Sequence, residues 1–412
     1  MLTPKDLLEE AIAMKETTTR HRQYLHLHPE IGFELPDTAA YVHSTLTSLG
    51  YTPTLCGKSG IIANIGRSPS PTVLLRADMD ALETKSGEAK HLCGHDMHTA
   101  MLLSAAELLK RHEASLHGSV RLMFQPAEES LEGARDMLKD DRLLSGVDAA
   151  VMLHVLSGIP LKTGMVILPP PGPTTPAVST FAVKLRGKGC HGAFPESGID
   201  PLLAAAHVLL ALESLITRES PTGDNAVLTV GHFSAGAAPN AIPDTAILEG
   251  TVRAIDSAAV EHLHDRIRTI AEGIATAMRA SAEVTFGEIC PPLENNPVLL
   301  RAVKDYLKEL LPENRCIDAE ALNKGKKGSS GSEDFAYLSP HVPTLMLTLV
   351  AGKEQNGVLY PQHHPLVAFD DEALPIGAAI YAYSALRLTE SLSKPTSVTN
   401  SLQTHHKENT SK

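Results

Sequence analysis

The sequence contains no tryptophan and few other aromatic residues. Its 412 residues include 8 Phe and 8 Tyr, against 20 His. The 5 cysteines are an odd, scattered set, which indicates reduced thiols rather than a disulfide framework. The N-terminus lacks a basic start followed by an apolar core, and no apolar run approaches the roughly 18 residues needed to cross a bilayer. These absences predict a cytoplasmic protein that does not insert into a membrane.

Positive charge is also in short supply. Against 48 acidic side chains stand 36 basic ones, a formal net charge of −12, which argues against nucleic acid or an anionic membrane as the main partner. A hydrophobic share of 43% with 20% charged residues is ordinary for a globular chain and excludes wholesale disorder. At this length a single core is improbable, so two domains are expected.

The pattern of apolar runs predicts one domain interrupted by another. Continuous apolar strands alternate with helical stretches in the first part of the chain, which is typical of a mostly parallel sheet covered by helices on both faces. The predicted strands are 61–65, 72–78, 119–125 and 148–154, with a helix over 99–114. We expect a catalytic α/β domain over 1–173 and 290–389, and a disordered polar tail over 390–412.

A proline-rich segment, LPPPGPTTP at 168–176, marks the crossing into the second domain, since proline does not fit inside a helix or a central strand. Residues 174–289 then follow the order β-α-β-β-α-β. This order predicts a smaller α+β domain with both helices on one face of its sheet.

Residues with metal-binding chemistry follow the ends of the predicted strands. Because the carboxyl ends of parallel strands meet in one crevice, these residues are expected to lie close together. Thiolate, imidazole and carboxylate are the donors of a zinc-type or related transition-metal site. The residues are Asp78, Asp80, Cys93, His95, Glu128, Glu129 and His154.

Each of these elements alone has an ordinary structural explanation. Cys93 and His95 could be a buried thiol and a polar loop residue, the two glutamates a solvated surface, and His154 a core histidine. Their occurrence at four strand ends favours a metal site. Other catalytic motifs are missing: the sequence lacks a complete phosphate loop, a nucleophile elbow and a dinucleotide fingerprint. Metal-assisted hydrolysis remains.

Several longer motifs resemble a known family. They are HRQYLHLHPEIGFE, LLRADMDAL, LCGHDMHTAMLLSAA, FQPAEES, GKGCHGAFPESGIDP, NAIPDTAILEGTVR, GSEDFAYL and HHP…FDDEAL. In this order, over about residues 20–387, they are similar to the aminoacylase and carboxypeptidase family of di-metal peptidases. The likeness is greatest to its amidohydrolase branch, which includes hippurate hydrolases, auxin-conjugate hydrolases and N-acetyl-amino-acid deacetylases.

The resemblance implies two divalent cations per subunit, of Zn, Mn, Co or Ni. Glu128 would be the general base, and Asp80 would orient the site from behind without ligating. The implied ligands are Cys93, His95, Glu129, His154 and His363, with His364 as the alternative to the last. Cys93 could bridge both cations as a thiolate.

In the inserted domain, the resemblance implies that His191 and Asn240 bind the oxyanion and the substrate. His191 would reach the active site of the partner subunit in a homodimer or higher homo-oligomer. Arg253 would dock a substrate carboxylate. The ordinary alternatives are a polar loop for the first two and a salt bridge within the domain for Arg253. The chain also departs from the family, because its segment between Asp80 and Cys93 is shorter than usual.

The expected function is therefore hydrolysis of the amide bond of N-acyl amino acids, with no nucleic-acid or membrane partner. A carboxypeptidase or dipeptidase would use the same site, and an ester or carbamoyl hydrolase would share every residue named. The alternative of another class is a non-catalytic metal- or ligand-binding relative. The presence of both Glu128 and Asp80 weighs against that alternative, because a metal binder needs neither.

Overall fold

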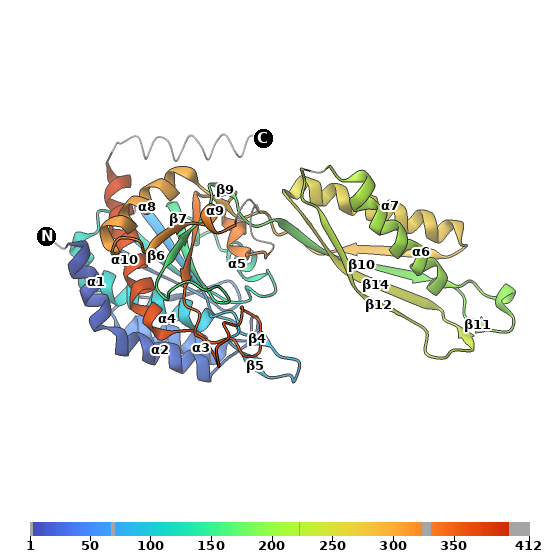
Figure 1. Ribbon diagram of the computed structural model, residues 1–412, viewed down its shortest axis with the longest axis horizontal. Coiled ribbons are helices and arrows are strands. Elements are labelled where there is room, and N and C mark those ends of the chain that lie inside the picture. Colours follow the sequence, from blue (N-terminus) through green and yellow to red (C-terminus); the bar gives the residue numbers. More distant parts are fainter. Residues whose placement is uncertain (1–2, 67–70, 222, 324–330, 395–412) are drawn as a thin grey trace. The chain divides into compact units, whose positions relative to one another are not determined.

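The computed structural model describes residues 3–66, 71–221, 223–323 and 331–394. The chain forms two compact units (Figure 1). The first unit contains the chain up to Thr174 and again from Glu294 onward, and the second contains Thr175–Leu293 with residues 331–332. The sequence pattern had set these crossings after residues 173 and 289.

An eight-stranded sheet forms the centre of the first unit. Its four middle strands, in the order β6-β3-β7-β18, run parallel. Every residue of β3 is buried, so both faces of the sheet are covered, and the predicted mostly parallel sheet with flanking helices is confirmed. The strands are β1 (Thr54–Cys56), β2 (Gly60–Gly66), β6 (Ser119–Gln125), β3 (Thr72–Asp78), β7 (Val147–Leu156), β18 (Thr344–Val350), β8 (Val166–Leu168) and β17 (Cys316–Asp318). His154 thus lies within β7 and not beyond its end.

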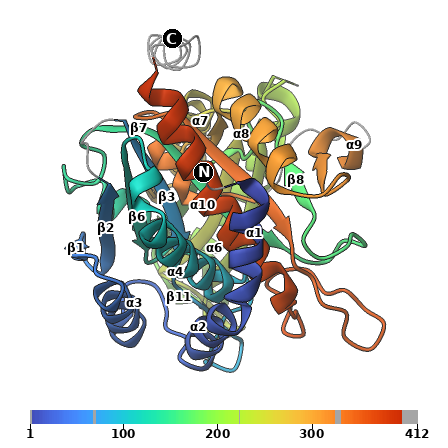
Figure 2. The ribbon, with the colours of Figure 1, turned by 90° about the vertical axis from the view of Figure 1, so that its left-hand side faces the viewer.

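Helices α4 and α10 pack against each other and against β3, and α1 and α2 pack on this pair (Figure 2). The longer helices of the unit are α1 (Pro4–Ala13), α2 (Lys15–Leu27), α3 (Pro36–Ser48), α4 (His95–Arg111), α8 (Pro297–Leu310) and α10 (Leu374–Ser393). Helix α4 begins at His95, earlier than the predicted residue 99. Helix α10 continues past Glu390, where the polar tail was expected to begin, and residues 395–412 lie outside the described part of the chain.

A short pair of antiparallel strands holds the proline-rich crossing in place. Strand β9 (Gly172–Pro173), which leads out of the first unit, pairs with β16 (Glu294–Asn295), which leads back into it. The Asn295 side chain is fully buried; it donates to Thr174 Oγ1 at 2.8 Å and accepts from the Met346 amide at 2.8 Å. The outgoing and returning chains therefore stay fixed to the edge of β18.

The second unit is a four-stranded antiparallel sheet with two helices on one face (Figure 1). The side chains of Asp200 and Asp256 cap these helices at their N-termini. The predicted β-α-β-β-α-β order is confirmed, and the unit has a hydrophobic core of its own. Its elements are β10 (Ala177–Arg186), α6 (Pro201–Ser214), β12 (Val227–Ala235), β14 (Thr245–Ala254), α7 (Ser257–Ala277) and β15 (Ser281–Phe286).

Helix α6 corrects one expectation about membranes. Together with the turn that follows it, it spans Pro201–Glu219 and, with a mean hydropathy of 1.4, is long and apolar enough to cross a bilayer. Only 33% of this apolar stretch is buried within the protein, and Leu203 and Leu210 are exposed on the outer side of the helix. A single helix of this kind is weak support for a membrane span, and it also fits an apolar face that packs on another protein.

Candidate metal centre

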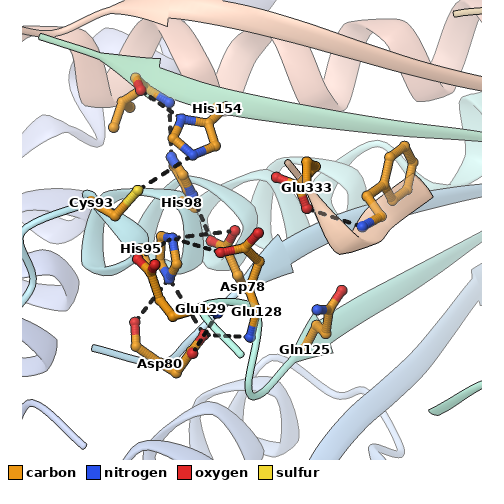
Figure 3. A network of polar contacts seen from close by, with 12 residues as sticks. Asp78, Asp80, Cys93, His95, His98, Gln125, Glu128, Glu129, His154 and Glu333 are labelled. Carbon is orange, nitrogen blue, oxygen red and sulfur yellow. Dashed lines mark hydrogen bonds and ion pairs between the residues drawn. The ribbon is translucent and has the colours of Figure 1, made fainter. Parts of the chain in front are cut away.

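The carboxyl ends of β3 and β6 lie side by side, with Asp78 opposite Gln125 in the parallel ladder. The segments that follow these strands meet the start of α4 and His154, near the carboxyl end of β7 (Figure 3). The predicted carboxylates, thiol and imidazoles are thereby brought together in the first unit, for the reason expected of parallel strands.

Gly94 shapes the start of α4. Its φ is +94°, and a Cβ at this position would lie 2.4 Å from Cγ2 of Val155. Only glycine therefore fits both the backbone conformation and the space. This tight turn sets Cys93 and His95 on either side of Gly94, with Cys93 Sγ 3.6 Å from His154 Nε2.

Among the groups of three donors at this cluster, one combines His95 with Glu128 and Glu129, and two share Cys93. One group is Cys93, His95 and His154, and the other is Cys93, Glu129 and His363; within each, the donor atoms all lie within 4.8 Å of one another. Two three-donor groups with a common thiol are the arrangement needed by two cations bridged by a thiolate.

Of the two adjacent histidines His363 and His364, the structure places only one beside the cluster. His363 Nε2 lies 3.6 Å from Glu129 Oε1. His364 instead stacks on Tyr360, and its Nδ1 accepts the amide hydrogen of Leu366. Of the two candidates, His363 is therefore the one at the cluster.

The hydrogen bonds of the cluster leave donor atoms free where a cation would lie. His95 Nδ1 donates to the Asp80 carbonyl at 2.9 Å, and His154 Nδ1 donates to the Val155 carbonyl at 2.6 Å. In the neutral rings, Nε2 of His95 keeps its lone pair, and Nε2 of His154 faces the Cys93 thiol at 3.6 Å. His95 Nε2 and Glu129 Oε1 are buried without a hydrogen-bond partner. Buried polar atoms in this condition are costly unless a ligand satisfies them, so the residues fit a divalent metal.

Asp80 lies behind the cluster. Its two carboxylate oxygens accept the backbone amides of Glu128 at 3.0 Å and Glu129 at 3.1 Å. Both oxygens are therefore engaged in holding the loop that carries the two glutamates. This geometry is that of an orienting residue and leaves Asp80 little capacity to ligate.

Burial shifts the pKa values of the cluster. Burial, followed by the nearby charges of Glu333 and Asp334, raises the pKa of Glu128 well above its usual range. Burial also raises the pKa of Glu129 to about 7 and that of the Cys93 thiol, and it lowers the pKa of His154. His154 is consequently neutral, as a ligand must be, whereas a cation is needed to draw the proton from Cys93.

Sequence reasoning missed a buried ionic network beside Glu128. Arg76 is fully buried in the middle of β3, and its guanidinium donates to Asp78 at 2.8 Å, Glu333 at 2.9 Å and Asp334 at 3.1 Å. Gln125 binds both Arg76 and Asp334. A charged residue inside an apolar strand run was the signal available, because such a charge is almost never buried without partners.

In the second unit, His191 and Asn240 come together. Strand β11 (Cys190–His191) pairs with β13 (Ala241–Ile242), and the Gly192 amide donates to the Asn240 carbonyl at 2.8 Å. Both side chains belong to exposed residues. These two candidates therefore lie side by side at one short two-stranded sheet of the unit.

Arg253 lies elsewhere in the same unit. It is opposite Val178, whereas Thr245, at the start of β14, is opposite Arg186. Eight residues of extended strand separate Arg253 from Thr245, about 26 Å at roughly 3.3 Å per residue. Thr245 and Arg186 mark the end of the sheet that is next in sequence to Asn240 and His191. Arg253 Nη1 donates to Ser332 Oγ at 2.7 Å. The unit thus keeps Arg253 apart from His191 and Asn240.

The shortened segment before Cys93 forms a small hairpin. Strands β4 (Leu82–Glu83) and β5 (Ala89–Lys90) pair antiparallel, and Thr84 and Ser86 bond to each other in the turn. The shorter chain therefore closes on itself between Asp80 and Cys93.

Comparisons with known proteins agree with this geometry. Residues 74–387 match the profile of peptidase family M20/M25/M40. The chain is 36% identical to an N-acetyl-L-cysteine deacetylase of Bacillus subtilis, over 90% of this chain and 88% of that protein. It is 34% identical to an IAA-amino acid hydrolase of Arabidopsis thaliana, over 90% and 85%. Among solved structures, a dinuclear metal-binding peptidase of the M20 family from Bacillus subtilis superposes with a TM-score of 0.73 at 30% identity, covering 92% of this chain and 99% of that one.

Proposed function

Because the chain belongs to peptidase family M20/M25/M40, we propose that its metal centre cleaves the amide bond of N-acyl amino acids to a free amino acid and a carboxylate. Membership of the family makes the chain a metal-dependent amide hydrolase. The observation that carries the proposal is the pair of three-donor groups sharing Cys93, with Glu128 Oε2 beside them, 3.9 Å from His95 Nε2. Two deacylating or deconjugating relatives support the choice of substrate class.

Two divalent cations, of Zn, Mn, Co or Ni, would be held by Cys93, His95, Glu129, His154 and His363. They supply Lewis-acid activation of the scissile carbonyl and of the attacking water. Glu128 takes the proton of that water and returns it to the leaving amine nitrogen. Burial raises the pKa of Glu128 above its usual range, and a carboxyl with a raised pKa holds the proton that it must return to the amine. Asp80 keeps Glu128 in position through the backbone.

His191 and Asn240 bind the developing oxyanion and the substrate, and Arg253 grips the substrate carboxylate bidentately. Their separation within the second unit argues that one subunit does not bring all three to a single site. His191 and Asn240 therefore serve the site of a partner subunit, and the enzyme is a homodimer or higher homo-oligomer.

The outer side of α6 and α7 supports an assembly of this kind. Leu202, Leu203 and Leu210 are exposed there. Beside them is a hollow of about 510 Å³, lined by His207, Leu210, Ala211, Ile274, Ala277 and Met278. Exposed leucines around an apolar hollow are typical of a surface that another protein covers. The proposed location is the cytoplasm, consistent with free thiols.

The test of the proposal is Glu128→Gln. The variant keeps the size of the side chain and every proposed ligand, so it should bind the cations as tightly as the wild type. Loss of a general base should lower kcat by about 10²–10⁴-fold. Asp80→Asn serves as a contrast, since it perturbs the loop and should reduce cation binding too. Full turnover by Glu128→Gln on acetyl- and benzoyl-amino acids would sink the assignment.

A carboxypeptidase or dipeptidase remains the second candidate, because it would use the same residues. The same assay separates the two by comparing N-acyl amino acids with unblocked dipeptides. Preferential cleavage of dipeptides would favour the second candidate. A purified wild-type protein with neither cations nor hydrolysis of either class would identify a non-catalytic relative.

A further inference from the structure

His98 is buried beside the metal centre, and both of its ring nitrogens are engaged. Nδ1 donates to Asp78 Oδ1 at 2.5 Å, and Nε2 accepts the Val155 amide hydrogen at 2.8 Å. An imidazole bonded in this way is neutral and has no lone pair to offer a cation. Asp78, His95 and His98 lie close enough to hold a metal ion, yet these hydrogen bonds exclude His98 from that role.

The carboxylate and the backbone carbonyl of Asp78 also accept hydrogen bonds within the protein. Its Oδ2 accepts from Arg76 Nη1 at 2.8 Å, and its backbone carbonyl accepts from Thr99 Oγ1 at 2.7 Å. Arg76 and Asp78 are both fully buried, so water does not compete for these bonds. The ion pair therefore holds the acceptor of His98 in one position.

The contacts of His98 continue to His154. The Val155 peptide that donates to His98 Nε2 belongs to the same residue whose carbonyl accepts from His154 Nδ1. The rings of His98 and His154 also meet edge to face, with centroids 4.5 Å apart at 66°. His98 thus helps to hold the backbone anchor of His154, whose Nε2 points toward Cys93; the Val155 carbonyl also accepts from Gln362 Nε2 at 2.8 Å.

We propose that Arg76, Asp78 and His98 form a relay that orients His154 for cation binding, with His98 as a positioning residue and not a ligand. The inference rests on the proposed function only in taking His154 as a ligand. Removing such supporting hydrogen bonds typically costs 10–100-fold in metal affinity. The cost should fall on one cation of the pair, because His154 belongs to only one of the two donor groups.

Two substitutions at His98 distinguish the links of the relay. The amide of Asn reaches about as far as Nδ1, so His98→Asn retains a donor for Asp78 and leaves the Val155 amide without an acceptor. The amide of Gln reaches about as far as Nε2, so His98→Gln restores that acceptor. Thr99→Val is the matched control: it removes a buried hydrogen bond to the Asp78 carbonyl, one residue along α4, and leaves the relay intact.

The experiment is titration of the metal-free full-length proteins with Co²⁺, followed by the visible absorption of the bound ion. We expect His98→Asn to bind one of two Co²⁺ ions about 10–100-fold more weakly with an altered spectrum. His98→Gln should recover most of that affinity, and Thr99→Val should match the wild type. Excess Co²⁺ should restore hydrolysis by His98→Asn, whereas it should not restore Glu128→Gln.

Wild-type Co²⁺ affinity and spectrum in a folded His98→Asn would overturn the relay, as would an equal loss in Thr99→Val. If His98→Asn does not fold, His98→Gln decides: retention of both ions supports positioning, and loss of one ion would make His98 a ligand. A wild-type protein that binds no Co²⁺ would instead refute the proposed function itself.

Discussion

Glu129→Gln should stabilise the metal-free protein while it removes a proposed cation ligand. The Glu129 side chain is only 14% exposed, and burial, with the charges of Asp80 and Asp78, outweighs the attraction of His95 and raises its pKa from 4.5 to about 7. A folded-state pKa above the unfolded value means that the native protein binds the proton more tightly. The stability this proton provides is present below about pH 4.5 and is lost as the pH rises to about 7.

The size of the effect follows from that shift. Raising a pKa from 4.5 to about 7 corresponds to about 3 kcal/mol of stability lost by the wild type above pH 7. A glutamine carries no charge and avoids this loss. With a chelator present, Glu129→Gln should therefore be more stable than the wild type by up to about 3 kcal/mol at pH 8, and by only about 1 kcal/mol at pH 5.

Urea unfolding followed by far-UV circular dichroism measures the difference, since the chain has no tryptophan to report by fluorescence. Glu132→Gln, in the same loop with its side chain 48% exposed, is the control and should show little pH-dependent gain. Addition of Co²⁺ should reverse the order, because the ion stabilises only a protein that can bind it tightly. The reasoning fails if Glu129→Gln is less stable than the wild type in chelator at pH 8, or if the difference does not grow with pH.

Two further predictions concern the start of α4 and the outer side of α6. Gly94→Ala places a Cβ 2.4 Å from Val155 Cγ2 at a φ of +94°, so it should destabilise the fold by more than about 1 kcal/mol and weaken Co²⁺ binding; unchanged melting and titration curves would contradict this. Leu210→Asp charges an exposed apolar face and should shift a dimer toward monomer in light scattering, whereas Leu27→Asp, at a similarly exposed leucine of α2, should not. Equal masses for Leu210→Asp and the wild type would count against α6 as the contact.

Much of the fold was predictable because it depends on local patterns. Apolar runs separated by helical stretches predict a parallel sheet, and proline-rich segments predict where one unit gives way to the other. The start of α4 was placed too late, because the left-handed Gly94 and the first turn, which contains His95 and His98, have no apolar periodicity. The predicted strand 148–154 stopped at His154, whereas β7 continues to Leu156, because a polar residue inside a strand resembles a strand end.

Part of the metal centre was also predictable. Asp80, Cys93, His95 and Glu129 follow strands or begin a helix, and parallel strands deliver such residues to one edge. The choice between neighbouring histidines was not predictable in this way. His363 and His364 are adjacent in sequence, and only the left-handed backbone at His363, with φ +65°, turns one ring toward Glu129 and leaves the other on Tyr360.

The sequence by itself determined the two-domain α/β architecture and the family and indicated the candidate donor residues, because strand order and residue chemistry are properties of the chain. The tertiary structure decided which ring nitrogens the protein itself engages: both in His98, but only Nδ1 of His95 by a backbone carbonyl. His98 and His154 are alike in the sequence, yet the Val155 amide donates to Nε2 of His98 and the Val155 carbonyl accepts from Nδ1 of His154. The bond between Val155 and His98, and those from Arg76 to Glu333 and Asp334, join segments far apart in the chain, so no local pattern contains them.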